Sequence, residues 1–248
     1  RNQFPEDVGP AAHPVQPKAY LEIKNFYTAT IYEKGAEVVR MLFHLLGRET
    51  FIRGVRHYLD THDYQAVTKD AFLASMEAVS GYDLGRFRTW YDQAGRPVVE
   101  ASGRYDAARS VYELTLTQRN GLADVQPTAG TVPYPIPVAF GLVGRSGRPV
   151  AAQLEGTQAH VLDFDGAQRV FRLENVGEPV VPSLFRGFSA PVTYQSGLAQ
   201  ADLAHLMVFD TDAFNRWDAA QQLGIAVIRA LAADWRAGRP LELPEVYR

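Results

Sequence analysis

The sequence contains no cysteine, so disulfide bonds and thiolate metal ligands are excluded from this chain. No apolar run approaches the roughly 18 residues of a membrane span. Neither sign of charge is in large excess, since the net charge is −3 and the pI is about 6.1. The sequence therefore offers no electrostatic footprint for nucleic acid or for an anionic membrane surface, and we expect neither as a partner.

What is present is typical of a globular protein that can bury a core: apolar residues make up 46% of the 248 positions, and the mean hydropathy is −0.18. The chain opens with RNQFPEDVGP, which has neither an initiator Met nor the basic-then-apolar pattern of a signal peptide. We interpret the sequence as a piece of a longer polypeptide. We expect three parts, over residues 1–95, 96–195 and 196–248.

The first part is predicted to be a loop followed by helices. Residues Arg1 to Lys18 carry four prolines and no periodicity, which predicts an extended surface loop. Gly47 suits the end of the first helix, and Thr68 suits the N-cap of the third. The first predicted helix starts at about Glu33. The other three cover Thr50 to Tyr58, the residues from Thr68 to Gly81, and Leu84 to Tyr91. The apolar residues expected on their buried faces are Val38, Met41, Leu42, Leu45, Phe51, Val55, Leu59, Phe72, Leu73, Met76 and Val79.

The second part changes to period-two alternation. In VYELTLTQ the residues Tyr112, Leu114 and Leu116 point one way, and IPVAFGLV alternates in the same manner. Short alternating strands separated by turn signals predict an antiparallel β-sandwich. Prolines before and within the IPVAFGLV strand predict an edge position for it. Further strands are predicted at about 149–154, 160–164, 169–173 and 189–194.

The third part is predicted to be helical again. Asp210 or Thr211 is expected to cap the helix, and the residues expected near one face are Phe214, Trp217, Ala220, Val227, Leu231 and Trp235. The final GRPLELPEVYR reads as a loop. Two or three helices cannot bury all these apolar residues alone, so we interpret this part as the start of a larger helical domain.

Few side chains suggest catalysis or metal binding. His57 and His62 are five residues apart, whereas zinc helices place two histidines four apart on one face, so a helix end is the favoured interpretation. His44, alone in an apolar helix, is expected to be a core or boundary residue. The sequence contains no G-x-S-x-G, no His-Glu-x-x-His and no phosphate-binding lysine motif.

Two tyrosines in NFYTATIYEKGAEVVRM, Tyr27 and Tyr32, remain as candidates. A Tyr beside a helix start is usually an amphipathic residue at the edge of a core. A phenol acts in catalysis when it donates a hydrogen bond to charge that appears only in the transition state, and its pKa near 10 keeps it protonated at neutral pH. Spacing alone does not decide between these roles.

A resemblance bears on that choice. NFYTATIYEKGAEVVRMLFHLLG (25–47), FIRGVRHYLDTHDYQAVTKDAFLASME (51–77) and FRTWYDQAGRPVV (87–99) resemble the bacterial alanyl aminopeptidase N family of gluzincin zinc metallopeptidases. IPVAFGL, FSAPV and FNRWDAAQ resemble its later segments, so the likeness runs along the chain in the family's order. It implies a multidomain α+β fold: the helical end of a thermolysin-like catalytic domain, an antiparallel β-sandwich, and the start of an α-helical domain.

The resemblance also implies site roles. Tyr32, in YEKG, is the family's donor to the oxyanion of the tetrahedral intermediate, and Tyr27 matches a residue that binds the substrate by lining the pocket for its first side chain. Neighbouring Glu33 and Lys34 are expected to hold Tyr32 in place. Peptides are the implied substrates, and a cytoplasmic location is expected from the family and from the lack of cysteine.

The family's zinc site and its amine-binding Gly-Ala-Met-Glu-Asn motif are absent from this sequence. We therefore expect zinc in the parent enzyme with its ligands upstream of this chain and not in it, the rest of the polypeptide as a partner, and an inactive fragment. Two alternatives stay open. Leukotriene epoxide hydrolases carry a similar tyrosine motif but lack the β-sandwich, and the chain could instead be a non-catalytic scaffold or binding module.

Overall fold

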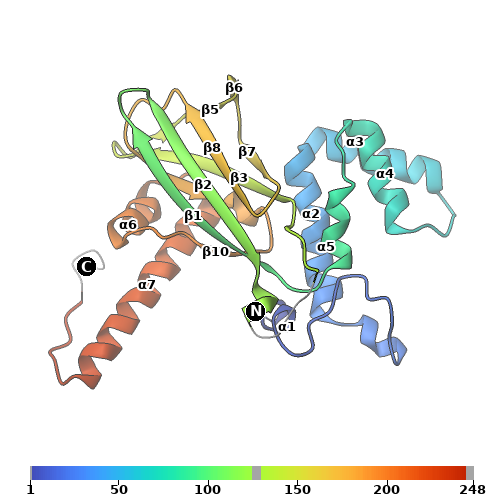
Figure 1. Ribbon diagram of the computed structural model, residues 1–248, viewed down its shortest axis with the longest axis horizontal. Coiled ribbons are helices and arrows are strands. Elements are labelled where there is room, and N and C mark those ends of the chain that lie inside the picture. Colours follow the sequence, from blue (N-terminus) through green and yellow to red (C-terminus); the bar gives the residue numbers. More distant parts are fainter. Residues whose placement is uncertain (1, 125–129, 244–248) are drawn as a thin grey trace.

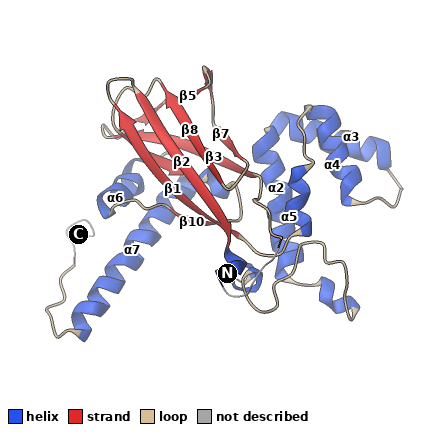
Figure 2. Ribbon diagram, in the orientation of Figure 1, coloured by secondary structure: helices blue, strands red, loops and turns tan. Residues whose placement is uncertain are grey.

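The computed structural model describes residues 2–124 and 130–243. A β-sandwich lies in the middle, a group of helices that includes α2, α3, α4 and α5 lies on one side, and α6 and α7 lie on the other (Figure 1). Figure 2 shows the strands confined to the central part. The predicted fold class, helices followed by a β-sandwich and then by further helices, is confirmed. Among the described residues, every helix is too short or too polar to span a bilayer.

A short helix, α1 (Gln3–Asp7), lies where an extended loop was predicted, so that prediction was wrong for these residues. Pro5 falls in the first turn, where a missing N–H breaks no helical hydrogen bond. Gln3 and Asp7 are buried, so α1 packs into the folded chain and is not a surface loop.

The predicted helices of the first part are present, with shifted ends. α3 begins directly after Gly47, whose φ of 75° ends the helix before it, and α3 extends to His62. Tyr58 packs edge-on against Phe72 of α4, whereas Leu59, predicted to be buried, is exposed. Each helical residue turns by about 100°, so Leu59 falls outside the stripe that Tyr58 continues. The helical segments are η1 (Ile23–Phe26), η2 (Thr30–Lys34), α2 (Gly35–Leu46), α3 (Arg48–His62), α4 (Lys69–Ser80), η3 (Arg86–Arg88) and α5 (Thr89–Asp92).

The sandwich consists of two sheets. One has the strand order β10-β1-β2-β8-β5-β6, and in the other β3 pairs with β4, β7 and β9. Tyr112, Leu114 and Leu116 of β2 are buried as predicted. The strands are β1 (Pro97–Asp106), β2 (Val111–Asn120), β3 (Ile136–Gly144), β4 (Pro149–Val150), β5 (Gln153–Leu154), β6 (Thr157–Gln158), β7 (Val161–Phe164), β8 (Gln168–Glu174), β9 (Val180–Leu184) and β10 (Thr193–Gln195).

The predicted edge position of β3 is wrong, because β3 lies inside its sheet. The prolines near the start of β3 are tolerated there for a local reason. β9 pairs only with residues 140–144 of β3. Beside Pro137, the hydroxyl of Ser189 donates to the Pro137 carbonyl and accepts from the N–H of Ala139. A buried side chain thus replaces a strand where Pro137 cannot donate a hydrogen bond.

Three strands were not predicted: β1, β6 and β9. Gly103 interrupts the pattern of β1 and Pro182 that of β9, and both residue types weaken a strand signal. The strand predicted at 189–194 is reduced to β10, which pairs in parallel with β1, so one pair in the sandwich is not antiparallel.

The third part folds into α6 (Gln200–Phe209) and α7 (Ala213–Arg236). The cap of α7 is Asp212, whose carboxylate accepts from the N–H of Asn215, and not Asp210 or Thr211. The predicted buried face is also wrong in part, because Trp217 and Trp235 are exposed. The buried residues of α7 are Asn215, Ala219, Leu223 and Val227, of which Val227 was predicted. The predicted closing loop is described only as far as residue 243 and otherwise lies outside the described residues.

Candidate functional site

Tyr32 lies in η2, a single π-helical turn that leads into α2. Such turns occur often at functional sites, because they displace side chains from the regular helical positions. Its side chain is 59% exposed, so it is not sealed inside the helical core. Tyr27, at the end of η1, is 69% exposed. The structure brings these two predicted site residues together, because their rings stack with 6.0 Å between centroids and 20° between planes.

Neither phenol hydroxyl forms a hydrogen bond with any of the residues that the structure describes. Stacking on Tyr27 therefore supports the Tyr32 ring without engaging its hydroxyl. A phenol held in this way can donate a hydrogen bond to an oxyanion that approaches from solvent or from another part of a larger protein.

The turn that carries Tyr32 is held at its N-terminal end by α1. One carboxylate oxygen of Glu6 accepts both the backbone N–H of Thr30, at 2.8 Å, and the Thr30 hydroxyl, at 2.5 Å. Thr30 is fully buried. Burial raises the pKa of Glu6, but the two hydrogen bonds from Thr30 oppose this and the net pKa lies below its usual value.

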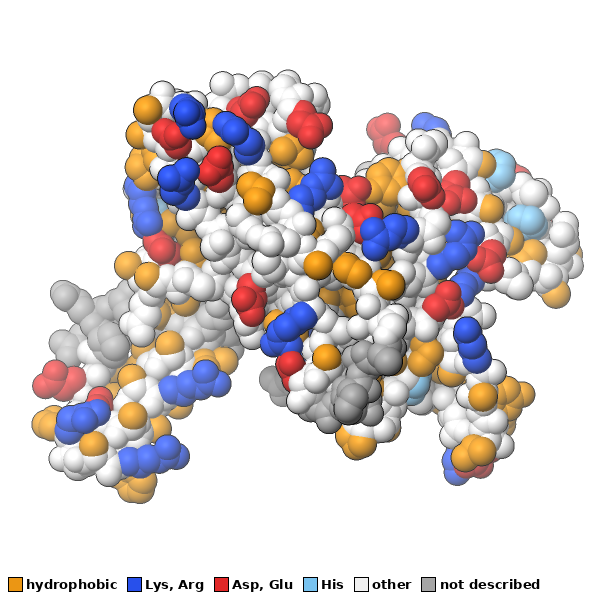
Figure 3. All heavy atoms as spheres, viewed as in Figure 1, with side chains coloured by type: hydrophobic (Ala, Val, Ile, Leu, Met, Phe, Trp, Pro, Cys, Tyr) orange, Lys and Arg blue, Asp and Glu red, His pale blue; other side chains and the backbone are white. Residues whose placement is uncertain are grey.

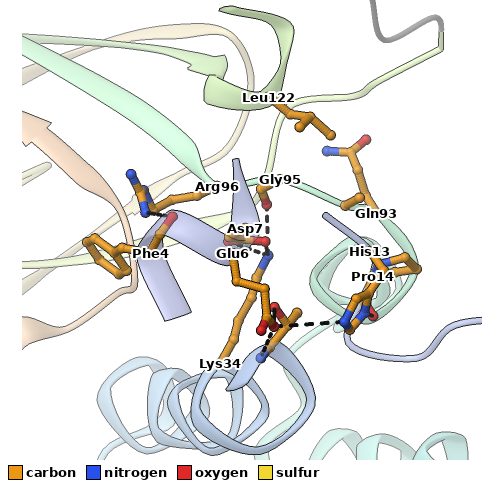
Figure 4. A network of polar contacts seen from close by, with 12 residues as sticks. Phe4, Glu6, Asp7, His13, Pro14, Lys34, Gln93, Gly95, Arg96 and Leu122 are labelled. Carbon is orange, nitrogen blue, oxygen red and sulfur yellow. Dashed lines mark hydrogen bonds and ion pairs between the residues drawn. The ribbon is translucent and has the colours of Figure 1, made fainter. Parts of the chain in front are cut away.

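The C-terminal end of the same turn is held by a buried ion pair. The ammonium of Lys34 donates to both carboxylate oxygens of Asp7, at 2.9 and 3.0 Å, and to the carbonyl of Gly95, at 2.7 Å. Figure 4 shows Lys34 reaching between Asp7 and Gly95. Its burial lowers the pKa of Lys34, and the Asp7 carboxylate opposes this by stabilising the charged form.

Arg96 ties α1 to the start of the sandwich. Its guanidinium lies over the ring of Phe4, 3.9 Å from the centroid, and donates to the Phe4 carbonyl at 2.8 Å and to the hydroxyl of Thr193 at 2.7 Å. Phe4, Glu6 and Asp7 therefore connect the Tyr32 turn to Gly95 and Arg96, which directly precede β1 (Figure 4).

Sequence reasoning missed Glu6 and Asp7, because the four prolines of the first 18 residues suggested an extended loop. The signal that could have found them is FPED, with a proline in a first turn followed by acidic residues, as helix starts prefer. Lys34 was expected to support Tyr32, and its side chain forms the buried ion pair with Asp7. Glu33 is exposed and has no such contact within the described part of the chain.

The other candidates do not assemble into a site. His57 is exposed, and His62 ends α3, as the helix-end interpretation predicts. His44 is a half-buried boundary residue beside Arg40, with 3.2 Å between their nitrogens. Within residues 2–124 and 130–243, no three His, Asp or Glu side chains are grouped closely enough to hold a metal ion.

Three family profiles match the chain in order. Residues 1–91 match the peptidase family M1 domain, residues 95–197 match a domain of unknown function with an Ig-like fold (DUF3458), and residues 200–247 match its C-terminal companion, described as ARM repeats. With the helices, sandwich and Tyr32 turn found here, these matches define the class of protein: the chain belongs to peptidase family M1.

Two similar relatives are bacterial proteins named Aminopeptidase N. That of Escherichia coli strain K12 is 40% identical over 98% of this chain, and that of Caulobacter vibrioides is 46% identical over 98%. The chain spans only 28% and 27% of the length of these relatives. Among solved structures, Legionella pneumophila aminopeptidase A in complex with aspartic acid matches with a TM-score of 0.78 and 32% identity, covering 95% of this chain and 25% of that chain.

Proposed function

We propose that this chain is a segment of a zinc-dependent aminopeptidase, which removes the N-terminal residue from peptides, and that Tyr32 stabilises the oxyanion of the reaction. The observation that supports this most directly is the Tyr32 phenol: it is exposed, its hydroxyl is free of contacts with the described residues, and it is carried on a turn held at both ends. Membership of family M1 supplies the reaction class.

The chemistry assigned to this chain is hydrogen-bond donation. When the scissile carbonyl becomes tetrahedral, its oxygen gains negative charge, and a phenol already aimed at that oxygen stabilises the charge without reorganising. Stacking on Tyr27 fixes the plane of the Tyr32 ring. Tyr27 in turn presents an apolar ring face that suits a wall of the pocket for the substrate's first side chain.

Zinc belongs to this proposal as the cofactor of the longer protein. The residues described in this chain do not fit a zinc site, since no group of three ligating side chains exists among them, and we derive no step through the metal. The proposal assigns the zinc ligands to other parts of the protein. It also includes domain boundaries near residues 95 and 195 and a cytoplasmic location, for which the family resemblance and the lack of cysteine are the support.

The test is Tyr32→Phe in the full-length protein, assayed with an alanyl chromogenic substrate. We expect turnover to fall by about 100- to 1,000-fold while KM changes little, because the lost hydrogen bond forms only in the transition state. Tyr64→Phe, a fully exposed tyrosine after α3, is the matched control and should leave turnover unchanged. Near-normal turnover of Tyr32→Phe would refute the role.

The scaffold alternative predicts a different result. A full-length protein that lacks peptidase activity when supplied with zinc would favour it over the enzyme. The epoxide hydrolase alternative is disfavoured by the β-sandwich that the structure contains.

A further inference from the structure

We propose that Glu6 and Asp7 are positioning residues, which fix the direction of the Tyr32 side chain by gripping η2 at both of its ends. We call the two contacts, Glu6 with Thr30 and Asp7 with Lys34, the α1 clamp. This inference rests on the proposed role of Tyr32 and extends it to residues that do not touch a substrate.

The clamp brackets Tyr32 symmetrically. Thr30 lies two residues before Tyr32 and Lys34 lies two residues after it, and adjacent residues of α1 hold both. Because α1 precedes η2 by more than twenty residues in sequence, these contacts are tertiary and do not come with the helix itself. They determine where the π-helical turn sits, and hence where the side chain at its centre points.

The Lys34 ammonium is held in place because all three of its N–H donors form hydrogen bonds. An ammonium has three N–H donors, and three oxygens accept from this one at 2.7 to 3.0 Å. Lys34 and Asp7 side chains are 0% and 1% exposed. Loss of any one of these contacts would leave a buried N–H donor unsatisfied, so the contacts together hold Lys34 in this arrangement.

The acceptor carbonyl of Gly95 extends the clamp to the sandwich. It also accepts the hydroxyl of Tyr134, at 2.8 Å, and Arg96 beside it binds the carbonyl of Phe4 on α1. The direction of Tyr32 is therefore set jointly by α1 and by the link between α5 and β1. A displacement of about 1 Å in a catalytic group is enough to cost on the order of 100-fold in rate.

Thr30→Val is the sharpest probe, because valine keeps the β-branched shape and removes only the hydroxyl that Glu6 accepts. In the full-length protein we expect turnover to fall by about 10-fold with KM within about 2-fold, as expected for an interaction that acts in the transition state. Thr30→Ser retains the hydroxyl and should restore most of the turnover. Glu6→Gln, which keeps the side-chain shape and weakens the acceptor, is a second variant should Thr30→Val fold poorly.

A double variant separates positioning from a merely structural role. If the clamp acts through the Tyr32 hydroxyl, adding Thr30→Val to Tyr32→Phe should lower turnover no further. A further 10-fold loss in the double variant would show that Thr30 acts independently of Tyr32 and would overturn the proposal.

A spectroscopic readout keeps this test independent of the enzyme proposal. With 3-fluorotyrosine at position 32 of the full-length protein, we expect Thr30→Val and Glu6→Gln to shift or broaden the fluorine resonance and Thr30→Ser to leave it close to the parent. Absence of peptidase activity in the parent would count against the proposed function and leave this readout intact. A fluorine spectrum and a turnover number both unchanged by Thr30→Val and by Glu6→Gln would overturn the clamp.

Discussion

Arg40 of α2 lies over the ring of Phe188, with 5.7 Å between the guanidinium carbon and the ring centroid. It also donates to the carbonyls of Gly187 and Phe188, in the loop between β9 and β10. These contacts tie the middle of α2, the helix that follows the Tyr32 turn, to the β-sandwich. Asp212 of the third part accepts from the N–H of Gly187, so the three parts of the chain meet at this loop.

Replacing Arg40 should weaken this junction. Arg40→Met keeps the aliphatic stem and leaves two carbonyls without their charged donor, so we expect a loss of about 2 kcal/mol in the free energy of unfolding. Urea denaturation measures it. Arg104→Met, at an exposed ion pair with Glu113, is the control and should change stability little. Equal effects of the two substitutions would contradict the junction role.

Ser189 offers a second test, of the way β3 is completed. Ser189→Ala leaves the buried Pro137 carbonyl and the part-buried Ala139 N–H without this partner, and we expect a cost of about 1–3 kcal/mol. Ser146→Ala, at an exposed hydroxyl that bonds Glu178, should be nearly neutral. Hydrogen exchange at Ala139 should accelerate in Ser189→Ala, and protection equal to that of the parent would refute this account.

The sequence was sufficient where local periodicity and burial agree. Leu114 and Leu116 alternate with polar neighbours and are buried in β2, and Met41 and Leu42 lie on the buried face of α2. The family motif indicated Tyr27 and Tyr32 as candidate site residues. Their stacking could not be predicted, because it depends on how η1 and η2 fold against each other.

Other features depend on distant residues and left no local signal. The Asp7–Lys34 pair spans 27 positions, and the Lys34–Gly95 contact spans 61. Pro182 lies inside β9, where single-sequence rules disfavour a strand, and pairing with Leu142 overrides that preference. Trp217 and Trp235 were expected to be buried because they are apolar, but periodicity does not say which side of α7 meets the sandwich.

The start of α7 provides a third prediction. The carboxylate of Asp212 caps the helix and accepts from Gly187 as well, so Asp212→Ala should cost about 1–2 kcal/mol. Asp234→Ala, which removes an exposed ion pair with Arg239 near the other end of the helix, is the matched control and should have little effect. Thermal unfolding of both variants measures the difference, and equal melting temperatures would contradict the capping role.

The Glu6–Thr30 contact should make stability depend on pH. The pKa of Glu6 is lowered in the folded protein from a usual value of 4.5, so its contribution is fully present above about pH 4.5 and is lost as the pH falls through the folded-state pKa. Gln mimics the protonated carboxyl. The stability gap between the parent and Glu6→Gln should therefore be largest near neutral pH and close as the solution is acidified.

Urea denaturation of both proteins between about pH 3 and pH 6 checks this. His13 is the other titratable group at this contact, 3.8 Å from the Glu6 carboxylate, and His13→Gln in both backgrounds removes its contribution. A gap that stays constant across the range would show that the charge of Glu6 does not stabilise the fold.

Gly95 connects the stability of the α5–β1 link to the site. Its φ is 90°, and an added Cβ would overlap the Asn120 side chain and lie 2.8 Å from the Cβ of Leu122. Gly95→Ala should cost about 3 kcal/mol, from backbone strain and overpacking together. Gly81→Ala also has a positive φ, of 71°, but its Cβ would meet nothing within 4 Å, so backbone strain of about 1 kcal/mol is its whole cost.

The difference in stability between these two variants isolates the steric effect at residue 95. That steric effect should also change activity, because the Gly95 carbonyl contacts Lys34. Relief of the overlap must move the Gly95 backbone, and the oxygen that Lys34 and Tyr134 share moves with it. Because Lys34 ends the turn that carries Tyr32, Gly95→Ala in the full-length protein should lower turnover as well as stability, whereas Gly81→Ala should lower stability alone. Turnover of folded Gly95→Ala equal to that of Gly81→Ala would show that the link does not position the phenol.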